Sequence, residues 1–243
     1  FGGPPVPMGY HSVMRWNGST FTPVGPQQFA GIRRLLVWDD GSGPALWGVG
    51  NITVPGGSTS GNLVRWNGTS WATFAQLTGQ SGTNGAIEDA AVLPGPAGGL
   101  VVCGTFTIAG AVPADGIAKW NGQSWDPLGT PSGPWNYVRA VGVHDFGSGA
   151  QIVCAGVWPP HLLRYDGASW TVMTSLTSEI SLIRSVPYGG GHALLVALQP
   201  GIADGVKVAG VARFDGTNWD ALGGGVDGTC ADIVPYLDGH GYR

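Results

Sequence analysis

Seven charged side chains stand where a ligand site could form, at the starts of four predicted strands and in one C-terminal segment. They are Arg33, Arg34, Glu88, Asp89, Arg139, Arg184 and Asp232. Alignment of the predicted strands places Arg33, Glu88, Arg139 and Arg184 on one level and Arg34, Asp89 and Asp232 on the next. Because side chains alternate along a strand, one level should point into a shared central channel. Only 11% of the residues are charged, so this ring is the best candidate ligand site, with mutual neutralisation by ion pairing as the alternative.

Two tryptophans are candidates for stacking on a sugar or on a protein partner. Trp135 and Trp158 flank loops rich in proline and glycine. An exposed indole in such a loop offers a flat apolar surface to a ligand. Packing of the ring against its own loop is the alternative interpretation.

Motifs for covalent or metal chemistry are few. The histidines show no HxH or HExxH spacing, although His144, His192 and His240 fall near corresponding turns and leave a metal on one rim as an alternative. No GxSxG motif occurs, and no helix follows the glycine-rich stretches to complete a phosphate loop. The three cysteines lack CxxC spacing and are interpreted as small buried strand residues. We therefore predict no catalytic residue, no metal and no cofactor.

Composition excludes several classes of protein. The 44 glycines and 18 prolines leave no window for a long helix, and 43% hydrophobic residues argue against disorder. A net charge of −4 without any large basic cluster disfavours nucleic-acid binding, and no apolar run is long enough for membrane insertion. We expect residues 1–243 to form a single β domain. The chain starts at Phe1 without a visible signal peptide, so it is interpreted as a mature or trimmed product, or as a fragment of a longer repeat protein.

A seven-residue unit that runs basic, aromatic, Asn or Asp, Gly, any residue, polar, aromatic occurs five times. The copies are RWNGSTF (15–21), RWNGTSW (65–71), KWNGQSW (119–125), RYDGASW (164–170) and RFDGTNW (213–219). Asn-Gly or Asp-Gly between short apolar segments predicts a hairpin with a two-residue turn. Such a turn would place Trp66 opposite Thr69 and Val64 opposite Trp71. Both faces of every hairpin are apolar, so each sheet should be covered on both sides by neighbouring sheets.

Two further strands are predicted between successive hairpins. The pairs are Ile32–Trp38 with Ala45–Val49, Ile87–Leu93 with Leu100–Phe106, Val138–His144 with Gln151–Val157, and Ile183–Val186 with Ala193–Leu198. Four short strands per period are typical of a β-propeller blade. We predict an all-β propeller of five four-stranded blades. One blade would close the ring by pairing the N-terminal strands (His11–Trp16 and Phe21–Gly25) with a C-terminal strand (Cys230–Leu237), and a larger ring in a longer parent chain is the alternative.

The repeated segments resemble a known class of propeller repeats. Glycine-ending strands such as VVCGTF, followed by a strand ending in aromatic–Asn/Asp–Gly, are similar to kelch and galactose-oxidase-type repeats. The stretches DDGSGPAL (39–46) and GTFTIAGAVPADGIAKWNG (104–122) resemble more closely the WNG-type tandem repeats of large secreted bacterial surface proteins. This resemblance implies a propeller located outside the cell or at its surface. The copper site of galactose oxidase has no matching motif here, so its activity is not implied.

These observations favour a non-catalytic extracellular or cell-surface module that binds a protein or carbohydrate partner or serves a structural role. Two alternatives remain. The charged channel could serve an enzyme or a small-ligand receptor, and an incomplete fifth blade could make the chain a self-assembling subunit of a surface layer or filament.

Overall fold

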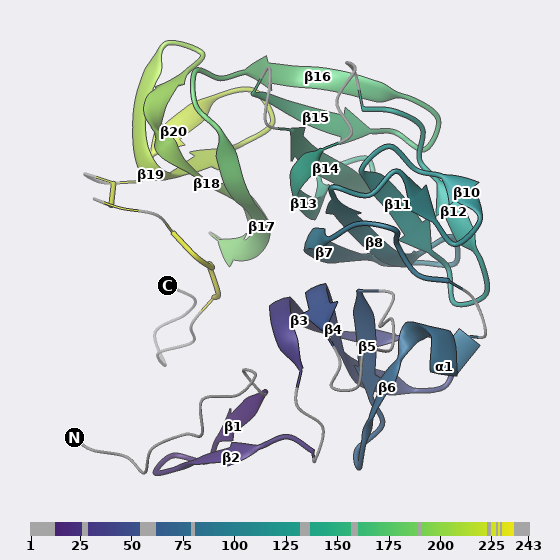
Figure 1. Ribbon diagram of the computed structural model, residues 1–243. Coiled ribbons are helices and arrows are strands. Elements are labelled where there is room, and N and C mark those ends of the chain that lie inside the picture. The colour runs from purple at the N-terminus through teal and green to yellow at the C-terminus, as the bar shows by residue number, and fades with distance from the viewer. Residues whose placement is uncertain are drawn as a thin grey trace.

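The computed structural model describes residues 13–25, 29–53, 62–78, 81–131, 137–156, 160–188, 191–222, 225–226, 228 and 230–235. Within these ranges the chain is all-β, with four four-stranded and two two-stranded antiparallel sheets and one five-residue helix, α1 (Phe74–Thr78) (Figure 1). No helix in the described part of the chain is long and apolar enough to cross a membrane.

Each large sheet is built from four strands that follow one another along the chain. The first contains β3 (Ala30–Asp39), β4 (Pro44–Thr53), β5 (Leu63–Trp66) and β6 (Trp71–Thr73). The second contains β7 (Ile87–Leu93), β8 (Gly99–Gly104), β11 (Ile117–Trp120) and β12 (Trp125–Pro127), with the small hairpin β9 (Ile108–Ala109) and β10 (Val112–Pro113) between β8 and β11. The third contains β13 (Val138–Asp145), β14 (Ala150–Gly156), β15 (His161–Tyr165) and β16 (Trp170–Ser175). The fourth contains β17 (Ile180–Tyr188), β18 (Gly191–Ala203), β19 (Val206–Phe214) and β20 (Trp219–Ala221). The predicted pairs of strands between the hairpins are confirmed, but several bounds differ. Strand β17 begins three residues before the predicted Ile183, β4 and β18 extend four and five residues beyond the predicted Val49 and Leu198, and β8 ends two residues before the predicted Phe106.

A bulge interrupts the first strand of every large sheet near its start. In the second sheet, Ile87 pairs with Gly104 and Asp89 with Cys103, so Glu88 has no partner across the ladder. Glycine at position 104 permits this close approach, because a Cβ there would overlap the carbonyl oxygen of Ala86. Because the bulge adds one residue to the strand, it determines which face of the sheet each later side chain of that strand points to.

The repeated hairpins differ from the prediction in their turns. Trp66 pairs with Trp71 and Val64 with Thr73, so the loop has four residues rather than two. Gly68 takes the positive φ of 98°, whereas Asn67 stays at negative φ and its side-chain oxygen accepts hydrogen bonds from the N–H groups of Thr69 and Ser70. The side chain thus replaces the second left-handed residue that a type I′ turn requires. Both aromatics and Val64 still share one face, as predicted.

The four large sheets pack face to face in chain order. Strand β3 contacts β7, β7 contacts β13, and β13 contacts β17, and Figure 1 shows these first strands nearest the middle of the molecule. Trp120 and Val102 of the second sheet pack in a core shared with the first sheet, whereas Val101 and Ile117 pack against the third. The second sheet is therefore apolar and covered on both faces, as the repeats predicted.

The cysteines follow the prediction in two cases of three. Cys103 and Cys154 are fully buried in strands, and burial raises the pKa of both thiols. Cys230 is only partly buried, because it lies on the segment 230–235 rather than in a strand.

The two ends of the chain form no four-stranded sheet within the described residues. Strand β1 (Met14–Trp16) pairs with β2 (Phe21–Pro23) alone, and residues 230–235 form no strand, contrary to the predicted closing blade. The base of the β1–β2 hairpin packs on the first sheet, where Trp71 donates a hydrogen bond from Nε1 to the Val24 carbonyl at 2.7 Å. The remaining parts of that blade, 11–12 and 236–237, lie outside the described residues.

Candidate functional site

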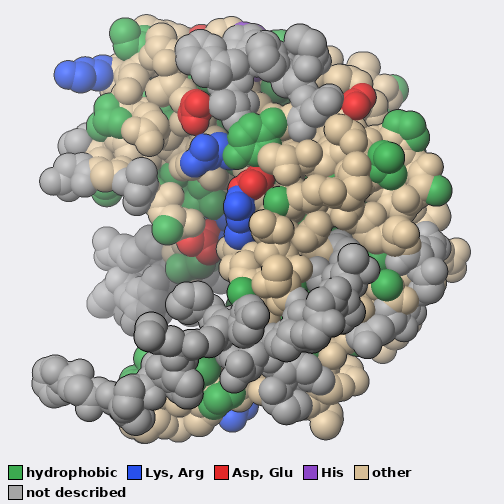
Figure 2. Space-filling view, viewed as in Figure 1, with side chains coloured by type: hydrophobic (Ala, Val, Ile, Leu, Met, Phe, Trp, Pro, Cys, Tyr) green, Lys and Arg blue, Asp and Glu red, His purple; other side chains and the backbone are tan. Residues whose placement is uncertain are grey.

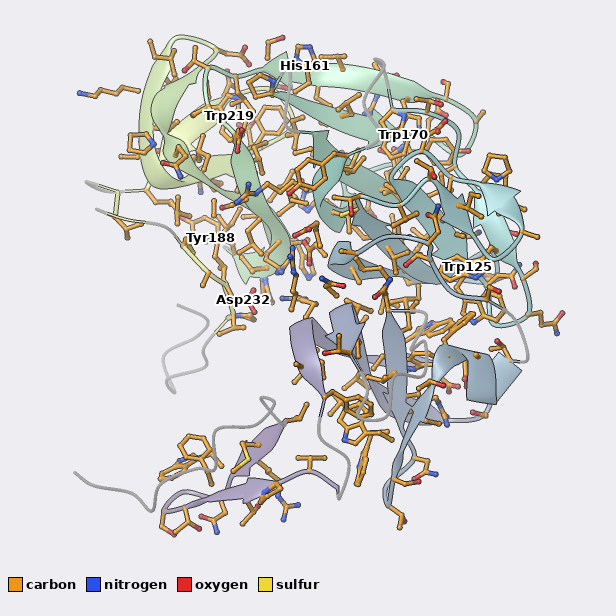
Figure 3. All side chains as sticks on the ribbon, in the orientation of Figure 1. Trp125, His161, Trp170, Tyr188, Trp219 and Asp232 are labelled. Carbon is orange, nitrogen blue, oxygen red and sulfur yellow. The ribbon has the colours of Figure 1, made fainter. Side chains whose placement is uncertain are left out.

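Four of the seven predicted charged residues meet in one ionic cluster. Arg34 comes from β3, Asp89 from β7, Arg184 from β17 and Asp232 from the segment 230–235. Asp232 lies beside β17 and β3 in Figure 3, and Figure 2 shows acidic and basic side chains next to each other in the hollow of this face. The cluster joins the first, second and fourth sheets.

Positive and negative groups alternate around the cluster. Arg184 donates from Nη1 to Asp89 Oδ2 at 2.9 Å and from Nε to Asp232 Oδ1 at 3.1 Å. Arg34 donates from Nη1 to both carboxylate oxygens of Asp232, at 2.9 and 3.0 Å. Its Nε lies 3.8 Å from Asp89 Oδ1, which completes the circuit. Two cations and two anions cancel, so the cluster carries no net charge.

Asp89 is the buried centre of this arrangement, with a side chain 5% exposed. Besides Arg184, its carboxylate accepts hydrogen bonds from the backbone N–H groups of Ala90, at 2.9 Å, and of Val141, at 3.3 Å. Burial raises the pKa of Asp89, and the charge and hydrogen bonds of Arg184 oppose that shift. Asp89 therefore ties β7 to both β13 and β17 through one carboxylate.

Asp232 has a different environment, with 48% of its side chain exposed. Partial burial acts to raise its pKa, but Arg34, the N–H of Ile233 and Arg184 together hold the pKa below its ordinary value. The carboxylate is thus ionised and salt-bridged while remaining open to solvent.

The other three predicted residues form ion pairs beside the cluster. Arg33 pairs with Glu88, and Arg139 pairs with Glu179 at 3.4 Å. Glu179 was missed by the sequence analysis because it precedes β17, at a position that the predicted strand did not include. Its opposite charge one sheet away from Arg139 is the signal that could have identified it. All seven predicted charged residues therefore have a partner of opposite sign.

The predicted levels are right for five residues and wrong for Arg184, and Asp232 has no level because its segment forms no strand. Arg33, Glu88 and Arg139 are the bulged residues of their strands, and Ser181 takes this place in β17. Arg184 lies three residues after Ser181 in β17. Its side chain is on the same side of the strand as that of Leu182, and Leu182 is the residue of β17 that aligns with Arg34 and Asp89. The early start of β17 at Ile180 causes the difference. It also lets Arg184 reach Asp89 and Asp232 together.

Two small cavities adjoin the cluster. One, of about 230 Å³, is lined by the four residues of the cluster, by the neighbouring Arg33–Glu88 pair, and by Ser181 and Leu182. The other, of about 210 Å³, is lined mostly by apolar residues of the first strands, with Arg34, Arg184 and Ser185 at its edge. The wall of the first cavity contains three guanidinium groups and three carboxylates in ion pairs, so a further carboxylate would have to replace one of those already present.

One hydroxyl–imidazole pair lies near the second cavity. Ser185 Oγ is 2.8 Å from His144 Nδ1, and His144 stacks edge-on against Phe146. Burial, with a smaller effect of His192, lowers the pKa of His144 and keeps it neutral, against the opposing charge of Asp145. Within the described residues no carboxylate hydrogen-bonds this imidazole, so the pair lacks the third group that orients a catalytic base.

The remaining predicted sites are only partly described. Trp135 and Trp158 lie outside the described residues, as does His240. No group of three or more His, Cys, Asp or Glu side chains that could hold a metal ion occurs in the part of the chain that the structure describes. No protein-family model, curated protein or solved structure matches the chain.

Proposed function

We propose that the chain is a non-catalytic binding or structural module, a five-bladed β-propeller that acts outside the cell or at its surface on a protein or glycan partner. The observation that carries this proposal is the pairing of every predicted channel charge with an opposite charge. A neutral, interlocked cluster where the first strands meet supports the sheets, and it leaves no charged group unpaired for catalysis among the seven. The location rests on the resemblance of the repeats to those of secreted bacterial proteins.

A repeated contact between sheets supports the five-bladed arrangement. Trp170 of the third sheet donates from Nε1 to the Leu128 carbonyl, just after the second hairpin, at 2.7 Å. Trp71 makes the same contact with Val24, just after the β1–β2 hairpin. The β1–β2 hairpin therefore relates to the first sheet as the second sheet relates to the third, which supports its assignment as the outer half of a fifth blade. Asp232 brings the C-terminal segment between the first and fourth sheets, where the inner strand of that blade would lie.

The exposed aromatic side chains favour a protein partner over a glycan. The repeat tryptophans Trp71, Trp120, Trp125 and Trp219 are buried between sheets, so they cannot stack on a sugar. Trp16, Phe21 and Tyr188 are exposed in the described chain, but the first two lie on the face of the β1–β2 hairpin that the fourth sheet would cover in a closed ring. Tyr188 therefore remains as the exposed aromatic side chain for a partner, and aromatic residues of this kind are enriched at protein interfaces.

Two alternatives are each favoured by one observation. The cavity of about 230 Å³ beside Arg34 and Arg184 would suit a small-ligand receptor or an enzyme. The exposed Trp16 face of β1–β2 would suit packing against the fourth sheet of another copy, as in a self-assembling filament.

The test compares binding with turnover in the intact chain. We expect saturable binding to a panel of extracellular proteins or glycans, no turnover on a broad substrate panel, and a concentration-independent monomer in size-exclusion chromatography. Turnover that is lost in Arg33→Ala or Arg139→Ala would overturn the non-catalytic assignment, provided that it persists in the control Arg213→Ala. Arg213 forms a comparable ion pair with Asp220, but away from the cluster.

A further inference from the structure

We propose that Arg34 and Arg184 form a carboxylate-binding site that the chain's own Asp232 occupies, and that an acidic peptide segment of a partner protein takes the same place. This inference rests on the proposed function as a binding module, and it names the chemistry by which the module would recognise a protein. The two guanidinium groups hold one carboxylate with three hydrogen bonds of 2.9 to 3.1 Å. Charge-assisted bonds of this kind are among the stronger polar contacts in proteins.

Asp232 supplies the polar attachment of its segment to the described sheets, and Cys230 and Ile233 of the same segment are partly buried. Within residues 230–235 the structure shows no strand, and the hydrogen bonds that reach the described sheets all end on the Asp232 carboxylate. The other two bonds of the segment are local, from Cys230 Sγ to the Asp232 carbonyl and from the Ile233 N–H to the Asp232 side chain. A segment whose described hydrogen bonds to the sheets all end on one half-exposed side chain can exchange with a competitor of the same chemistry.

One of the two binding groups has its own support apart from Asp232. Arg184 is fixed by Asp89 at 2.9 Å and by the carbonyl of Ile183 at 2.7 Å, and its side chain is 10% exposed. Within the described residues, Arg34 has only the ionic contact of 3.8 Å with Asp89 besides Asp232. The Arg184 side of the site is therefore preorganised, and two arginines with one aspartate leave a single positive charge for the ligand.

The surroundings favour a peptide carboxylate over a phosphate or a sugar acid. A phosphate brings up to two negative charges close to the buried Asp89 carboxylate, which repels the second charge. Among the described residues no aromatic ring lines the cavity, so they offer a sugar no stacking surface. The present occupant is itself a peptide, in which the N–H of Ile233 caps the Asp232 carboxylate. An aspartate followed by an apolar residue is the ligand that this site already fits.

The experiment vacates the site and supplies the peptide from solution. The probe is an acetylated, amidated peptide of residues 230–235 with Ser in place of Cys230, titrated by calorimetry into the full chain. Because the tethered segment competes at high local concentration, D232A should bind the peptide at least about tenfold more tightly than the wild type. A probe with Asn in place of its Asp should bind D232A at least about tenfold more weakly. R34A/D232A should lose the binding, and D220A, which vacates a surface ion pair, should bind no better than the wild type.

Several outcomes would overturn the proposal. Equal binding of the Asp and Asn probes to D232A would show that the carboxylate is not recognised. Equal or tighter binding of glucuronate or of a phosphoserine probe would overturn the peptide assignment. If D232A does not fold, hydrogen exchange in the wild type decides. Saturating peptide should speed exchange in 230–235 while β3 and β17 stay protected, and unchanged exchange overturns the inference. If the peptide does not bind at Arg34 and Arg184 but a partner protein binds at another surface, the proposed binding function stands and only this inference fails. If the chain shows catalytic turnover, the proposed non-catalytic function fails, whether or not the peptide binds.

Discussion

The hairpins β11–β12 and β1–β2 carry nearly the same sequence, KWNGQSW and RWNGSTF, but lie in different surroundings. Trp120 is 1% exposed and packs against Phe74 and Trp125, whereas Trp16 is 52% exposed and, among the aromatic rings of the described residues, contacts only Phe21. Both hairpins form the same four-residue loop with Gly at positive φ. The local sequence therefore determines the hairpin, and the preceding sheet determines whether its aromatic face is buried.

The identity of that preceding sheet explains the pattern. The rings of β11–β12 face the first sheet, and Trp219 of β19–β20 reaches back to Thr174 of the third sheet with a hydrogen bond of 3.3 Å. The β1–β2 hairpin comes before the first sheet, so in a closed ring its rings would face the fourth. Substitutions that separate the buried from the exposed copies therefore test how far the ring closes.

The largest effect is expected for the tryptophans. Trp120→Ala should lower the free energy of unfolding by about 3 to 5 kcal/mol, because it empties a packed site between two sheets. Trp16→Ala should cost less than about 1 kcal/mol, since only a cross-strand ring contact is lost. Urea unfolding of the two variants measures the difference. A cost for Trp16→Ala as large as that for Trp120→Ala would show that the fourth sheet covers the first hairpin in solution.

Buried and exposed ion pairs should differ in the same way as buried and exposed tryptophans. Asp89→Asn should lower the free energy of unfolding by about 3 kcal/mol, because it leaves Arg184 buried with only one anionic partner. Glu179→Gln, in the half-exposed pair with Arg139, should cost between about 0 and 1 kcal/mol. Chemical denaturation at neutral pH measures both. Equal costs would show that the central cluster is as well hydrated as the outer pair, and the description of Asp89 as a buried centre would then be wrong.

Much of the fold follows from the repeated unit, because alternating apolar residues around Asn-Gly or Asp-Gly specify a hairpin and its faces. Loop length was not predictable from that dipeptide alone. The Asn67 side chain accepts hydrogen bonds from two backbone N–H groups of the loop. These bonds stabilise the four-residue loop in place of a type I′ turn. The ring-closing strand was predicted from periodicity, but pairing also requires a partner edge, and residues 230–235 do not pair with one in the described chain.

The charged residues of the candidate site were placed by reasoning that holds only in part. Arg34 and Asp89 were placed by strand alignment, and the structure confirms their common level. Asp232 was placed on a strand, whereas it reaches the cluster from a segment without regular structure. Arg184 was placed on the wrong level, since a bulge and three extra residues in β17 do not show in the apolar pattern. A long side chain such as that of arginine can reach the cluster from more than one level of the strand. An error of one level in its predicted position therefore does not remove it from the cluster.

The smallest effect concerns a third enclosed group, His144, which lies on β13 and contacts Ser185 of β17, with Phe146 and His192 nearby. Burial lowers the pKa of His144, so below the ordinary histidine pKa of 6.5 the unfolded chain binds more protons than the folded chain. The free energy of unfolding should therefore fall as the pH drops from about 7 to about 5.5, and His144→Gln should flatten this decline while costing about 1 kcal/mol at neutral pH for the lost hydrogen bond. Thermal unfolding across this pH range measures the effect. The control Ser185→Ala removes the hydrogen bond but keeps the imidazole, so it distinguishes the effect of burying His144 from the effect of its hydrogen bond. If His144→Gln declines as steeply as the wild type, the acid sensitivity belongs to other groups and the contact between the third and fourth sheets is open to water.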